Sequence, residues 1–397
     1  MQKLITPIFL IAGTSIGGGM LALPMVLAKL GIAVSTIIML STWLLTYYSS
    51  LISVELNLHS EKGLSLGQLG KNFSGKVASL IGEVSVKLLS YALLAAFIYG
   101  ASSIIQKLME EYLNYYASMI SISTYLSISA ILILSLPTKL ISHINSVVFL
   151  CFLVIFAILI VIIAGEVDCT KIPWNADFKM KNMAEVITVI FTSFGYQVIF
   201  HTLRDYFGKD EKSLRISFLI GSFIPVIVYT LWTVGALSSI AKTNFDFFLT
   251  ITGGKVDVGA LVRELANLSG FAGFQILTWS MAITAISTSI FGVGIGLVES
   301  IESSLKISGK VVRKLSAAAL TIVPAYALAA IIPNGFTKIL GFAGAILVII
   351  AMLLPAYLFL RTRFEKLYLS ELKRWAIVVC TIIGIGIIMS EFITNNL

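Results

Sequence analysis

The chain has 397 residues, of which 58% are hydrophobic and only 12% are charged, and its mean hydropathy is +0.97. Because a soluble domain is about half apolar and a quarter charged, this composition excludes an ordinary soluble protein and predicts an integral membrane protein. The formal net charge of +8 would suit a nucleic-acid-binding protein, but the distribution of the basic residues argues against that class.

Apolar runs of about 20 residues, long enough to cross a bilayer as helices, alternate with short charged stretches along the chain. We expect about eleven membrane spans in one transmembrane domain, because every connection is too short for a soluble domain. The predicted spans are Leu4–Leu30, Val34–Leu58, Val77–Ile105, Ile120–Leu136, Ile144–Gly165, Met183–Leu203, Leu214–Ile240, Gly270–Val298, Ala317–Ile332, Thr337–Leu360 and Trp375–Ile393.

Basic residues concentrate on one side of these spans. The loops on the side of the N-terminus contain about eighteen Lys and Arg residues, whereas the opposite loops contain about nine. The positive-inside rule then predicts a cytoplasmic N-terminus, and eleven crossings place the C-terminus on the opposite side. Of the three cysteines only Cys169 lies outside the predicted spans, so we expect neither a disulfide nor a cysteine-rich metal site.

The first predicted span contains the segment GTSIGGGMLALP, from Gly13 to Pro24. Each glycine inside a helix costs roughly 1 kcal/mol relative to alanine, and this segment has four glycines and a proline. We interpret it as a break in the membrane helix that exposes backbone groups to a ligand. The alternative is that Gly17, Gly18 and Gly19 only allow neighbouring helices to approach closely.

A related segment, FTSFGYQ, occurs in the sixth predicted span. The T-S-x-G pattern that starts at Thr14 returns at Thr192, about 178 residues later, although four letters can also match by chance. Five spans lie in each period, and because five is odd the second copy enters the membrane from the opposite face. We therefore predict an inverted repeat, with repeat 1 at about 1–165, repeat 2 at about 180–360 and an extra helix at about 374–394.

Unwinding a helix in the middle of a membrane leaves N–H and C=O groups unpaired, which is costly unless protein, water or a ligand satisfies them. A zwitterionic amino acid supplies both kinds of partner. We expect its carboxylate to accept hydrogen bonds from N–H groups at the half-helix that begins near residues 17–19. Its ammonium group is expected to donate to the carbonyls around Thr14, Ser15, Phe191 and Thr192.

These two motifs, with GSFIPVIVYTLW from Gly221 and PNGFTKILGFAGAILVIIAMLLPAYL from Pro333, resemble the bacterial hydroxy and aromatic amino acid permease family. This family lies within the amino acid/polyamine/organocation transporter superfamily, and the similarity covers nearly the whole chain. The resemblance implies an all-α fold of five plus five helices in inverted repeat, with one extra helix, in the cell inner membrane. It also implies proton-driven uptake of tyrosine, tryptophan or phenylalanine, with L-tyrosine first, and no cofactor.

An aromatic substrate requires an apolar slot and one polar group for its phenol or indole N–H. We expect Phe194 and Tyr196 at the second break, and Tyr91 and Phe97 in the third span, to line this slot. Gln197 is the expected polar group. Because aromatic residues make up 11% of the chain, each of them is also a candidate for ordinary core or lipid contact.

Several ionisable residues lie in or near the predicted spans and are candidates for proton coupling. Glu83 and Lys87 are four residues apart in the third span, where they either form a structural ion pair or take part in coupling. His201 follows the second break and titrates in the physiological range, but an interfacial role is the alternative. Glu55 either shuttles protons or caps a helix junction.

The eighth predicted span concentrates the hydroxyl residues Ser287, Thr288 and Ser289. These hydroxyls, Ser287 and Thr288 above all, can face the carbonyls of Gly13 and Ile16, which is where sodium-driven members of this wider fold hold an ion. Hydrogen bonding between helices is the alternative, because Ser and Thr commonly make such bonds in membranes.

Together these features predict a proton-coupled symporter that carries an aromatic amino acid by alternating access. The nearest alternative is a sodium-coupled carrier of the same fold. An intramembrane enzyme and a non-transporting receptor or channel are alternatives from other classes. The sequence has no H-E-x-x-H motif and no Walker loop, and its three histidines are scattered, so we expect neither catalysis nor a bound metal. Neither a nucleic acid nor an obligate protein partner is expected.

Overall fold

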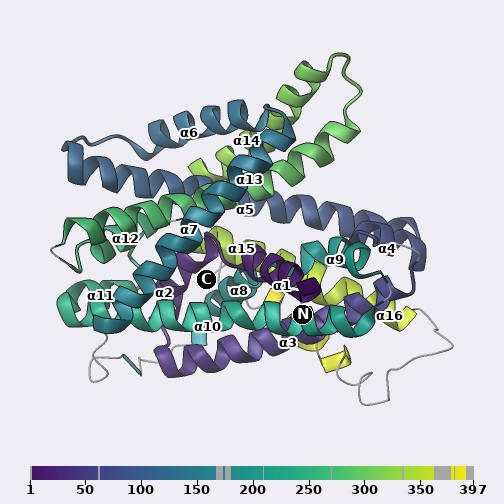
Figure 1. Ribbon diagram of the computed structural model, residues 1–397, viewed down its shortest axis with the longest axis horizontal. Coiled ribbons are helices and arrows are strands. Elements are labelled where there is room, and N and C mark those ends of the chain that lie inside the picture. Colours follow the sequence, from purple (N-terminus) through teal and green to yellow (C-terminus); the bar gives the residue numbers. More distant parts are fainter. Residues whose placement is uncertain are drawn as a thin grey trace.

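The computed structural model describes residues 2–60, 63–166, 173–174, 180–208, 210–269, 271–332, 335–361, 377–379 and 381–389, and these residues form helices without any β-strand (Figure 1). The labelled helices are α1 (Gln2–Ser15), α2 (Gly19–Leu27), α3 (Ile32–Leu58), α4 (Leu66–Phe73), α5 (Lys76–Leu113), α6 (Met119–Leu134), α7 (Thr138–Glu166), α8 (Met180–Ser193), α9 (Phe200–Phe207), α10 (Glu211–Thr243), α11 (Phe245–Thr252), α12 (Val258–Ala266), α13 (Ala272–Ser304), α14 (Lys310–Ile331), α15 (Gly335–Val348) and α16 (Leu354–Arg361).

Most of the long helices are apolar enough to cross a membrane. In the described part of the chain, seven helical runs meet this requirement: α3, α5, α7, α10, α13, α14 and the run Gly335–Arg361, in which the π-helical turn Ile349–Leu353 joins α15 to α16. The pair α1 and α2, bent by 56°, gives an eighth span if counted as one. Shorter apolar helices (α6, α8 and Ile377–Met389) lie within the remaining predicted spans. The all-helical membrane fold is therefore confirmed, whereas the count of eleven crossings stays a prediction.

Side chains cap the short helices that connect the spans. Ser65 and Gln68 form a capping box at the start of α4. Asn244 and Asp257 each accept a hydrogen bond from a backbone N–H in the first turn of α11 and α12. Such caps satisfy N–H groups that have no partner inside the helix, so these residues mark where each connecting helix begins.

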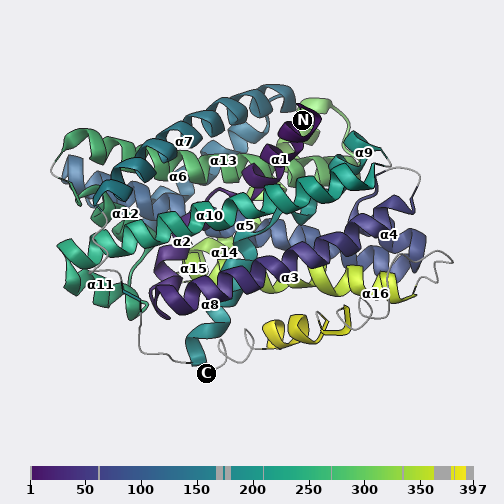
Figure 2. The same cartoon turned by 60° about the horizontal axis from the view of Figure 1, so that its bottom comes forward.

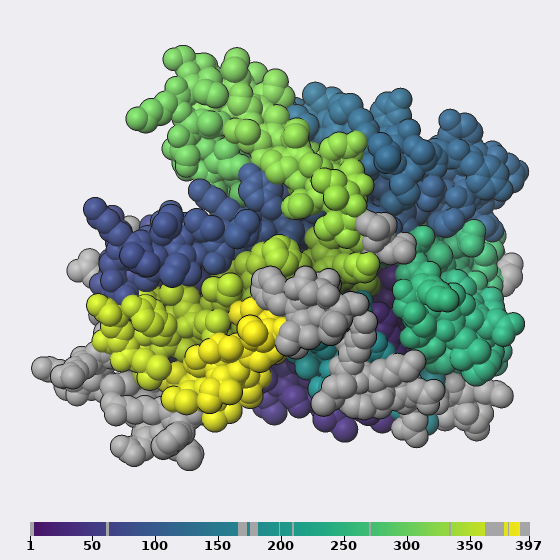
Figure 3. Space-filling view, turned by 180° about the vertical axis from the view of Figure 1, so that it is seen from behind, coloured from purple at the N-terminus to yellow at the C-terminus, as the bar shows by residue number. Residues whose placement is uncertain are grey.

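The broken helices lie inside the helix bundle. Figure 1 shows α1, α8 and α15 near the middle of the molecule, with α3 and α10 along one side of them. Figure 2 shows α10 running between α1 and α3, and α16 beside α3. Figure 3 shows the hairpin of α13 and α14, in green, projecting from one corner. Residues 20–27 of α2 are all buried, so protein rather than lipid surrounds this half-helix.

A glycine lets α15 approach the backbone of α8. A Cβ atom at Gly344 would overlap the carbonyl group of Thr188 and lie 2.7 Å from the hydroxyl oxygen of Thr192. That hydroxyl also lies 2.8 Å from the carbonyl oxygen of Leu340, to which it donates a hydrogen bond. Small residues commonly allow such close contact between membrane helices. The contact holds α8, and therefore the second break, against α15.

We predict that Gly344→Ala lowers the unfolding temperature of the purified protein in detergent, because the added methyl group pushes α15 away from the backbone of α8. Gly292→Ala in α13 is the matched control, since a Cβ there meets no atom within 4 Å. Alanine is favoured over glycine in helices by roughly 1 kcal/mol, so the control should unfold at or above the wild-type temperature. Equal unfolding temperatures for the two variants would contradict the close contact.

Candidate functional site

The first membrane span is broken at the glycine-rich motif. α1 ends at Ser15, residues 16–18 are not helical, and α2 begins at Gly19. The Ile16 N–H still bonds to the Ala12 carbonyl at 2.9 Å, so helical bonding ends there, and the chain then turns by 56°. The predicted break within residues 14–19 is therefore confirmed.

The sixth predicted span is broken at its own copy of the pattern. α8 ends at Ser193, Phe194 and Gly195 are not helical, and a 3₁₀ turn (Tyr196–Ile199) leads into α9. Ser15 and Ser193 are the same position of the two T-S-x-G motifs, so the first half of each span ends at the same residue of the pattern. The second predicted break is therefore confirmed. The inverted relation of the two repeats stays a prediction.

The two breaks lie side by side and share one hydroxyl group. The Tyr229 hydroxyl oxygen, on the continuous helix α10, lies 2.7 Å from the carbonyl oxygen of Ser15 and 2.9 Å from that of Ser193. A Cβ atom at Gly19 would lie 3.0 Å from the Ser193 hydroxyl oxygen. Tyr229 is fully buried, and its ring meets that of Phe194 edge-on, with centroids 5.8 Å apart.

Side chains from α13 and α5 close around the first break. The Gly18 N–H donates to the Ser289 hydroxyl oxygen at 2.9 Å, and a Cβ at Gly17 would lie 2.8 Å from the same oxygen. A Cβ at Gly18 would lie 2.7 Å from the ring of Phe97. Phe97, which was predicted only as a residue of the third span that lines the substrate slot, therefore lies at the first break, and its contact with a substrate stays a prediction. The glycines therefore allow close contact with α13 and α5, as the second interpretation of the motif states, whereas exposure of backbone groups to a ligand stays a prediction.

The hydroxyl groups of both T-S pairs bond within or beside their own helices. Thr14 donates to the Ile11 carbonyl at 2.9 Å, and Ser15 lies 3.3 Å from the same oxygen. The Thr192 hydroxyl oxygen lies 2.9 Å from the Thr188 carbonyl oxygen and 2.8 Å from the Leu340 carbonyl oxygen of α15, so its single proton serves one of these two acceptors at a time. These hydroxyl groups therefore have partners inside the protein, and binding of a ligand by the backbone carbonyls of the same residues stays a prediction.

Four of the residues predicted around the second break, Phe191, Phe194, Tyr196 and Gln197, are buried. Phe191, Phe194 and Tyr196 have no exposed surface, and the Tyr196 hydroxyl accepts a hydrogen bond from Ser50 at 3.2 Å. Gln197 is 5% exposed, yet neither its Oε1 nor its Nε2 atom has a hydrogen-bond partner within the described residues. An unpaired buried amide costs about 1–3 kcal/mol, so Gln197 is placed to gain from a polar ligand.

Two predicted residues of α5 are engaged away from the breaks. Tyr91 donates to the Leu320 carbonyl of α14 at 3.0 Å, so its hydroxyl serves the contact between α5 and α14. Glu83 accepts a hydrogen bond from Ser79 at 3.2 Å, and its side chain lies against Gly67 of α4. Within the described residues Glu83 and Lys87 form no ion pair with each other, and a role of either residue in coupling stays a prediction.

Among the three hydroxyl residues of the eighth span, Ser289 is the one that contacts the first break. Thr288 donates to the Ala285 carbonyl of its own helix at 3.0 Å, and neither it nor Ser287 bonds to Gly13 or Ile16. Successive residues are 100° apart around a helix, so neighbours in the sequence face different elements. A Cβ at Gly13 would instead lie 2.8 Å from the ring of Phe149 in α7.

The first motif also matches the G-x-S-x-G pattern of serine hydrolases, from Gly13 to Gly17. In such enzymes the serine sits on a sharp turn between a strand and a helix, whereas Ser15 ends a helix and bonds to Ile11. No histidine in the described part of the chain bonds to Ser15. The described residues also contain no group of three or more His, Cys, Asp or Glu side chains placed to hold a metal.

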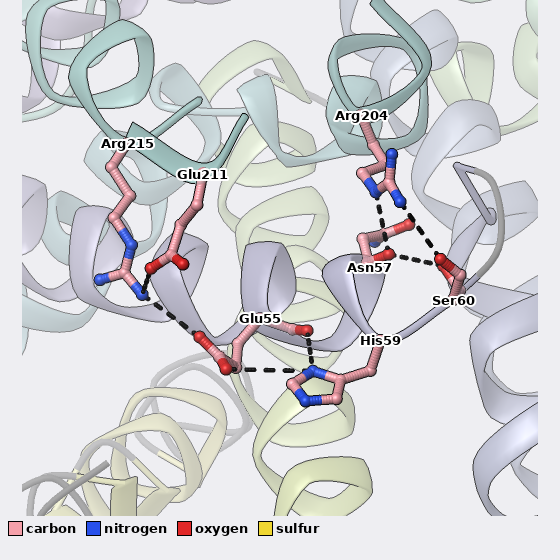
Figure 4. Close-up of polar contacts among 7 residues, drawn as sticks. All are labelled: Glu55, Asn57, His59, Ser60, Arg204, Glu211 and Arg215. Atoms are coloured by element: carbon pink, nitrogen blue, oxygen red, sulfur yellow. Dashed lines mark hydrogen bonds and ion pairs between the residues drawn. The ribbon is translucent and has the colours of Figure 1, made fainter. Parts of the chain in front are cut away.

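A polar network joins the end of α3 to the start of α10 (Figure 4). The buried carboxylate of Glu55 lies 3.2 Å from Arg215 and 3.9 Å from the ring of His59. Arg215 also pairs with Glu211 at 2.6 Å. This geometry supports the interpretation of Glu55 as part of a helix junction.

The same end of α3 is tied to α9 by a buried arginine (Figure 4). Arg204 donates to the carbonyls of Asn57 at 3.1 Å, Ser60 at 3.2 Å and Gly208 at 2.5 Å. These carbonyls lie at the C-terminal ends of α3 and α9, where unpaired acceptors and the helix dipole favour a cation. His201 lies in the first turn of α9, and its own carbonyl packs against Gly63.

Two contributors to this arrangement were not predicted from the sequence. Tyr229 appeared only inside the segment from Gly221, and Arg204 only among the basic residues that indicate topology. Ser289 was one of the three hydroxyl residues expected at the first break, but it meets the Gly18 N–H rather than the carbonyls of Gly13 and Ile16. The available signal was chemical: a tyrosine or an arginine in a membrane helix requires a polar partner. Nothing along the chain identifies that partner, because the acceptors are up to 214 positions away.

Comparison with known proteins shows similarity along the whole chain. The model of the tryptophan/tyrosine permease family matches residues 1–395. The chain is 30% identical over 364 residues to tyrosine-specific transport system 1 of Haemophilus influenzae, covering 91% of this chain and 89% of that protein. It is 25% identical to the tryptophan-specific transport protein of Pseudomonas aeruginosa (95% and 91% covered) and 27% identical to the low affinity tryptophan permease of Escherichia coli (90% and 86% covered).

We predict that Arg204→Met lowers the unfolding temperature in detergent by several degrees, because three buried carbonyls lose their donor at a cost of about 1–3 kcal/mol or more. Arg204→Lys should recover only part of this loss, since an ammonium group lacks the planar fork of donors. The control is Arg263→Met, which removes a guanidinium group that is 37% exposed. If all three variants unfold at the same temperature as the wild type, Arg204 does not hold α9 to α3.

Proposed function

We propose, since the chain belongs to the tryptophan/tyrosine permease family, that it is a proton-coupled symporter of an aromatic amino acid, with L-tyrosine as the first candidate. Its relatives, by their names, transport tyrosine or tryptophan. Family membership thus supports aromatic amino acid transport by a multi-pass membrane protein. The choice of L-tyrosine, the coupling ion and the mechanism are the finer parts of the proposal.

One observation carries the proposal: the ends of two broken helices meet at one point. The carbonyl oxygens of Ser15 and Ser193 both lie within 2.9 Å of a single hydroxyl oxygen. Carbonyls at helix C-termini carry partial negative charge and suit an ammonium group, whereas the N-terminus of α2 at Gly19 suits a carboxylate. The proposed site therefore binds the α-carboxylate near residues 17–19 and the α-ammonium at carbonyls that include those of Thr14, Ser15, Phe191 and Thr192.

The aromatic ring of the substrate is proposed to lie between the two breaks. Phe97 at the first break and Phe194 at the second supply apolar contacts. Tyr196 is buried beside them in the 3₁₀ turn. The unpaired amide of Gln197 supports a hydrogen bond to the phenol or the indole N–H. Such a bond would remove the cost of leaving the amide unsatisfied.

We propose alternating access in the inner membrane, with two inverted repeats, a cytoplasmic N-terminus and the C-terminus on the opposite side. Coupling requires that substrate and proton together favour the inward transition more than either alone. His201, which follows the second break, is the proposed titrating candidate. A sodium-coupled carrier is the second candidate, because the Ser289 oxygen contacts the first break.

Reconstitution into proteoliposomes tests the proposal. With an acidic exterior, the protein should accumulate radiolabelled L-tyrosine inside the vesicles. A protonophore should abolish accumulation, and replacement of sodium by choline should leave it unchanged. Uptake that requires sodium instead identifies the sodium-coupled carrier. Binding of tyrosine without accumulation, under any imposed gradient, would refute a symporter.

We predict that Gln197→Leu raises the KM for L-tyrosine about tenfold, as expected for the loss of one hydrogen bond to the substrate. The KM for L-phenylalanine should stay within about twofold, because this substrate has no polar group for the amide. Gln106→Leu is the matched control, since the Gln106 amide bonds to the Ala117 carbonyl outside the site. If the KM values for tyrosine and phenylalanine rise equally in the Gln197 variant, the Gln197 amide does not recognise the substrate side chain.

A further inference from the structure

The Tyr229 hydroxyl occupies a position with two acceptors and only one proton. It lies 2.7 Å from the Ser15 carbonyl oxygen and 2.9 Å from the Ser193 carbonyl oxygen, and no surface of the residue is exposed. A hydroxyl donates one full hydrogen bond at a time. At any moment one of the two carbonyl groups therefore receives a weaker hydrogen bond from Tyr229 than the other does. In a membrane interior an incompletely paired carbonyl is costly.

An ammonium group has three donors and a full positive charge. At the same position it would satisfy both carbonyls at once, and its charge would complement both helix C-termini. The chemistry at this point thus favours a primary ammonium group over a phenol. The phenol keeps the helix ends paired, but it does so incompletely.

We propose that Tyr229 is a placeholder for the substrate ammonium group, an inference that rests on the proposed transport function. In the empty carrier the hydroxyl pairs with the carbonyls of Ser15 and Ser193 and holds the two breaks together. When an amino acid binds, its ammonium group takes over both carbonyls and the hydroxyl withdraws. Tyr229 is then a positioning residue that substitutes for the substrate, and its hydroxyl competes with the substrate for the same acceptors.

The surroundings of Tyr229 connect this exchange to recognition of the side chain. Its ring meets Phe194 edge-on, at an interplanar angle of 66°. Phe194 is also the proposed contact for the aromatic ring of the substrate. A substrate that packs on Phe194 therefore disturbs the ring that holds the hydroxyl in place, so both ends of the substrate act on Tyr229.

The placeholder has a specific consequence for the transport cycle. Net uptake requires the empty carrier to return across the membrane, whereas exchange of internal for external substrate uses only the loaded carrier. Without the Tyr229 hydroxyl, the empty carrier lacks a donor for the two carbonyls during its return. The loaded carrier does not need this donor. Loss of the hydroxyl should therefore slow net uptake and spare exchange.

The test compares Tyr229→Phe with the wild type in proteoliposomes. We expect net uptake of L-tyrosine to fall at least tenfold, while exchange against internal L-tyrosine stays within about twofold. Tyr326→Phe is the matched control, because it removes a tyrosine hydroxyl that bonds to Thr124 between α14 and α6. It should leave the ratio of net uptake to exchange unchanged. Equal rates of net uptake in Tyr229→Phe and the wild type, or equal losses in both assays, would overturn the proposal.

A binding measurement provides a readout that a merely structural role would not move. 3-(4-Hydroxyphenyl)propionate is an analogue of L-tyrosine that lacks the ammonium group. The ratio of its Kd to the Kd for L-tyrosine therefore measures how much the ammonium group contributes to binding. In the wild type the ammonium must displace the Tyr229 hydroxyl, whereas in Tyr229→Phe it meets unpaired carbonyls. The ratio should therefore rise about tenfold in the variant. An unchanged ratio in a folded variant contradicts competition between the two groups.

If Tyr229→Phe does not fold, a protein that keeps the Tyr229 hydroxyl but carries a spectroscopic label at this position tests the same proposal. Incorporation of 3-fluorotyrosine at position 229 keeps the hydroxyl and gives a fluorine NMR signal from this site alone. L-phenylalanine should shift the signal further than 3-phenylpropionate, because both compounds pack on Phe194 beside the Tyr229 ring but only L-phenylalanine has an ammonium group that displaces the hydroxyl. The same shift with both compounds, or no shift at saturating L-phenylalanine, rejects the placeholder. Failure of the wild type to transport any amino acid would instead reject the proposed function, which the binding data alone do not test.

Discussion

Backbone groups released by the two helix breaks must find partners away from water, and this requirement organises the centre of the molecule. The carbonyls of Ser15 and Ser193 meet the Tyr229 hydroxyl, and the Gly18 N–H meets Ser289. Both hydroxyls come from continuous helices, α10 and α13. The unbroken helices therefore supply the polar groups that make two interruptions tolerable in an apolar interior.

Polar contacts also link the broken spans to their neighbours at positions remote from the breaks. Lys29, just after α2, pairs with Glu185 of α8 at 2.6 Å. Arg204 ties α9 to the end of α3, and the pair of Glu55 and Arg215 ties α3 to α10. These contacts link α2 to α8, α9 to α3 and α3 to α10.

The glycines of the first motif combine two roles that the sequence presents as alternatives. At Gly17 and Gly18 the missing side chains make room for Ser289 and Phe97, as in ordinary helix packing. The same positions end the helical hydrogen bonding and leave backbone groups open to other partners. Gly344 has only the packing role, because it lies inside α15 and meets the backbone of α8. A glycine in a membrane helix thus indicates that a neighbouring segment packs closely against it. Whether the helix is also broken there is seen only from where its helical hydrogen bonding ends.

Hydropathy and helix-breaking residues act locally along the chain, so the amino-acid sequence was enough to predict the membrane class, the helical fold and the positions of both breaks. It also placed Phe194 at the second break, because this residue lies inside the second T-S-x-G motif. Only the tertiary structure decided that Tyr229 joins the breaks, that Ser289 rather than Thr288 meets Gly18, and that Glu83 turns toward α4. These outcomes depend on the rotation of each helix about its axis and on which distant helix packs beside it, and local residue patterns do not specify either one.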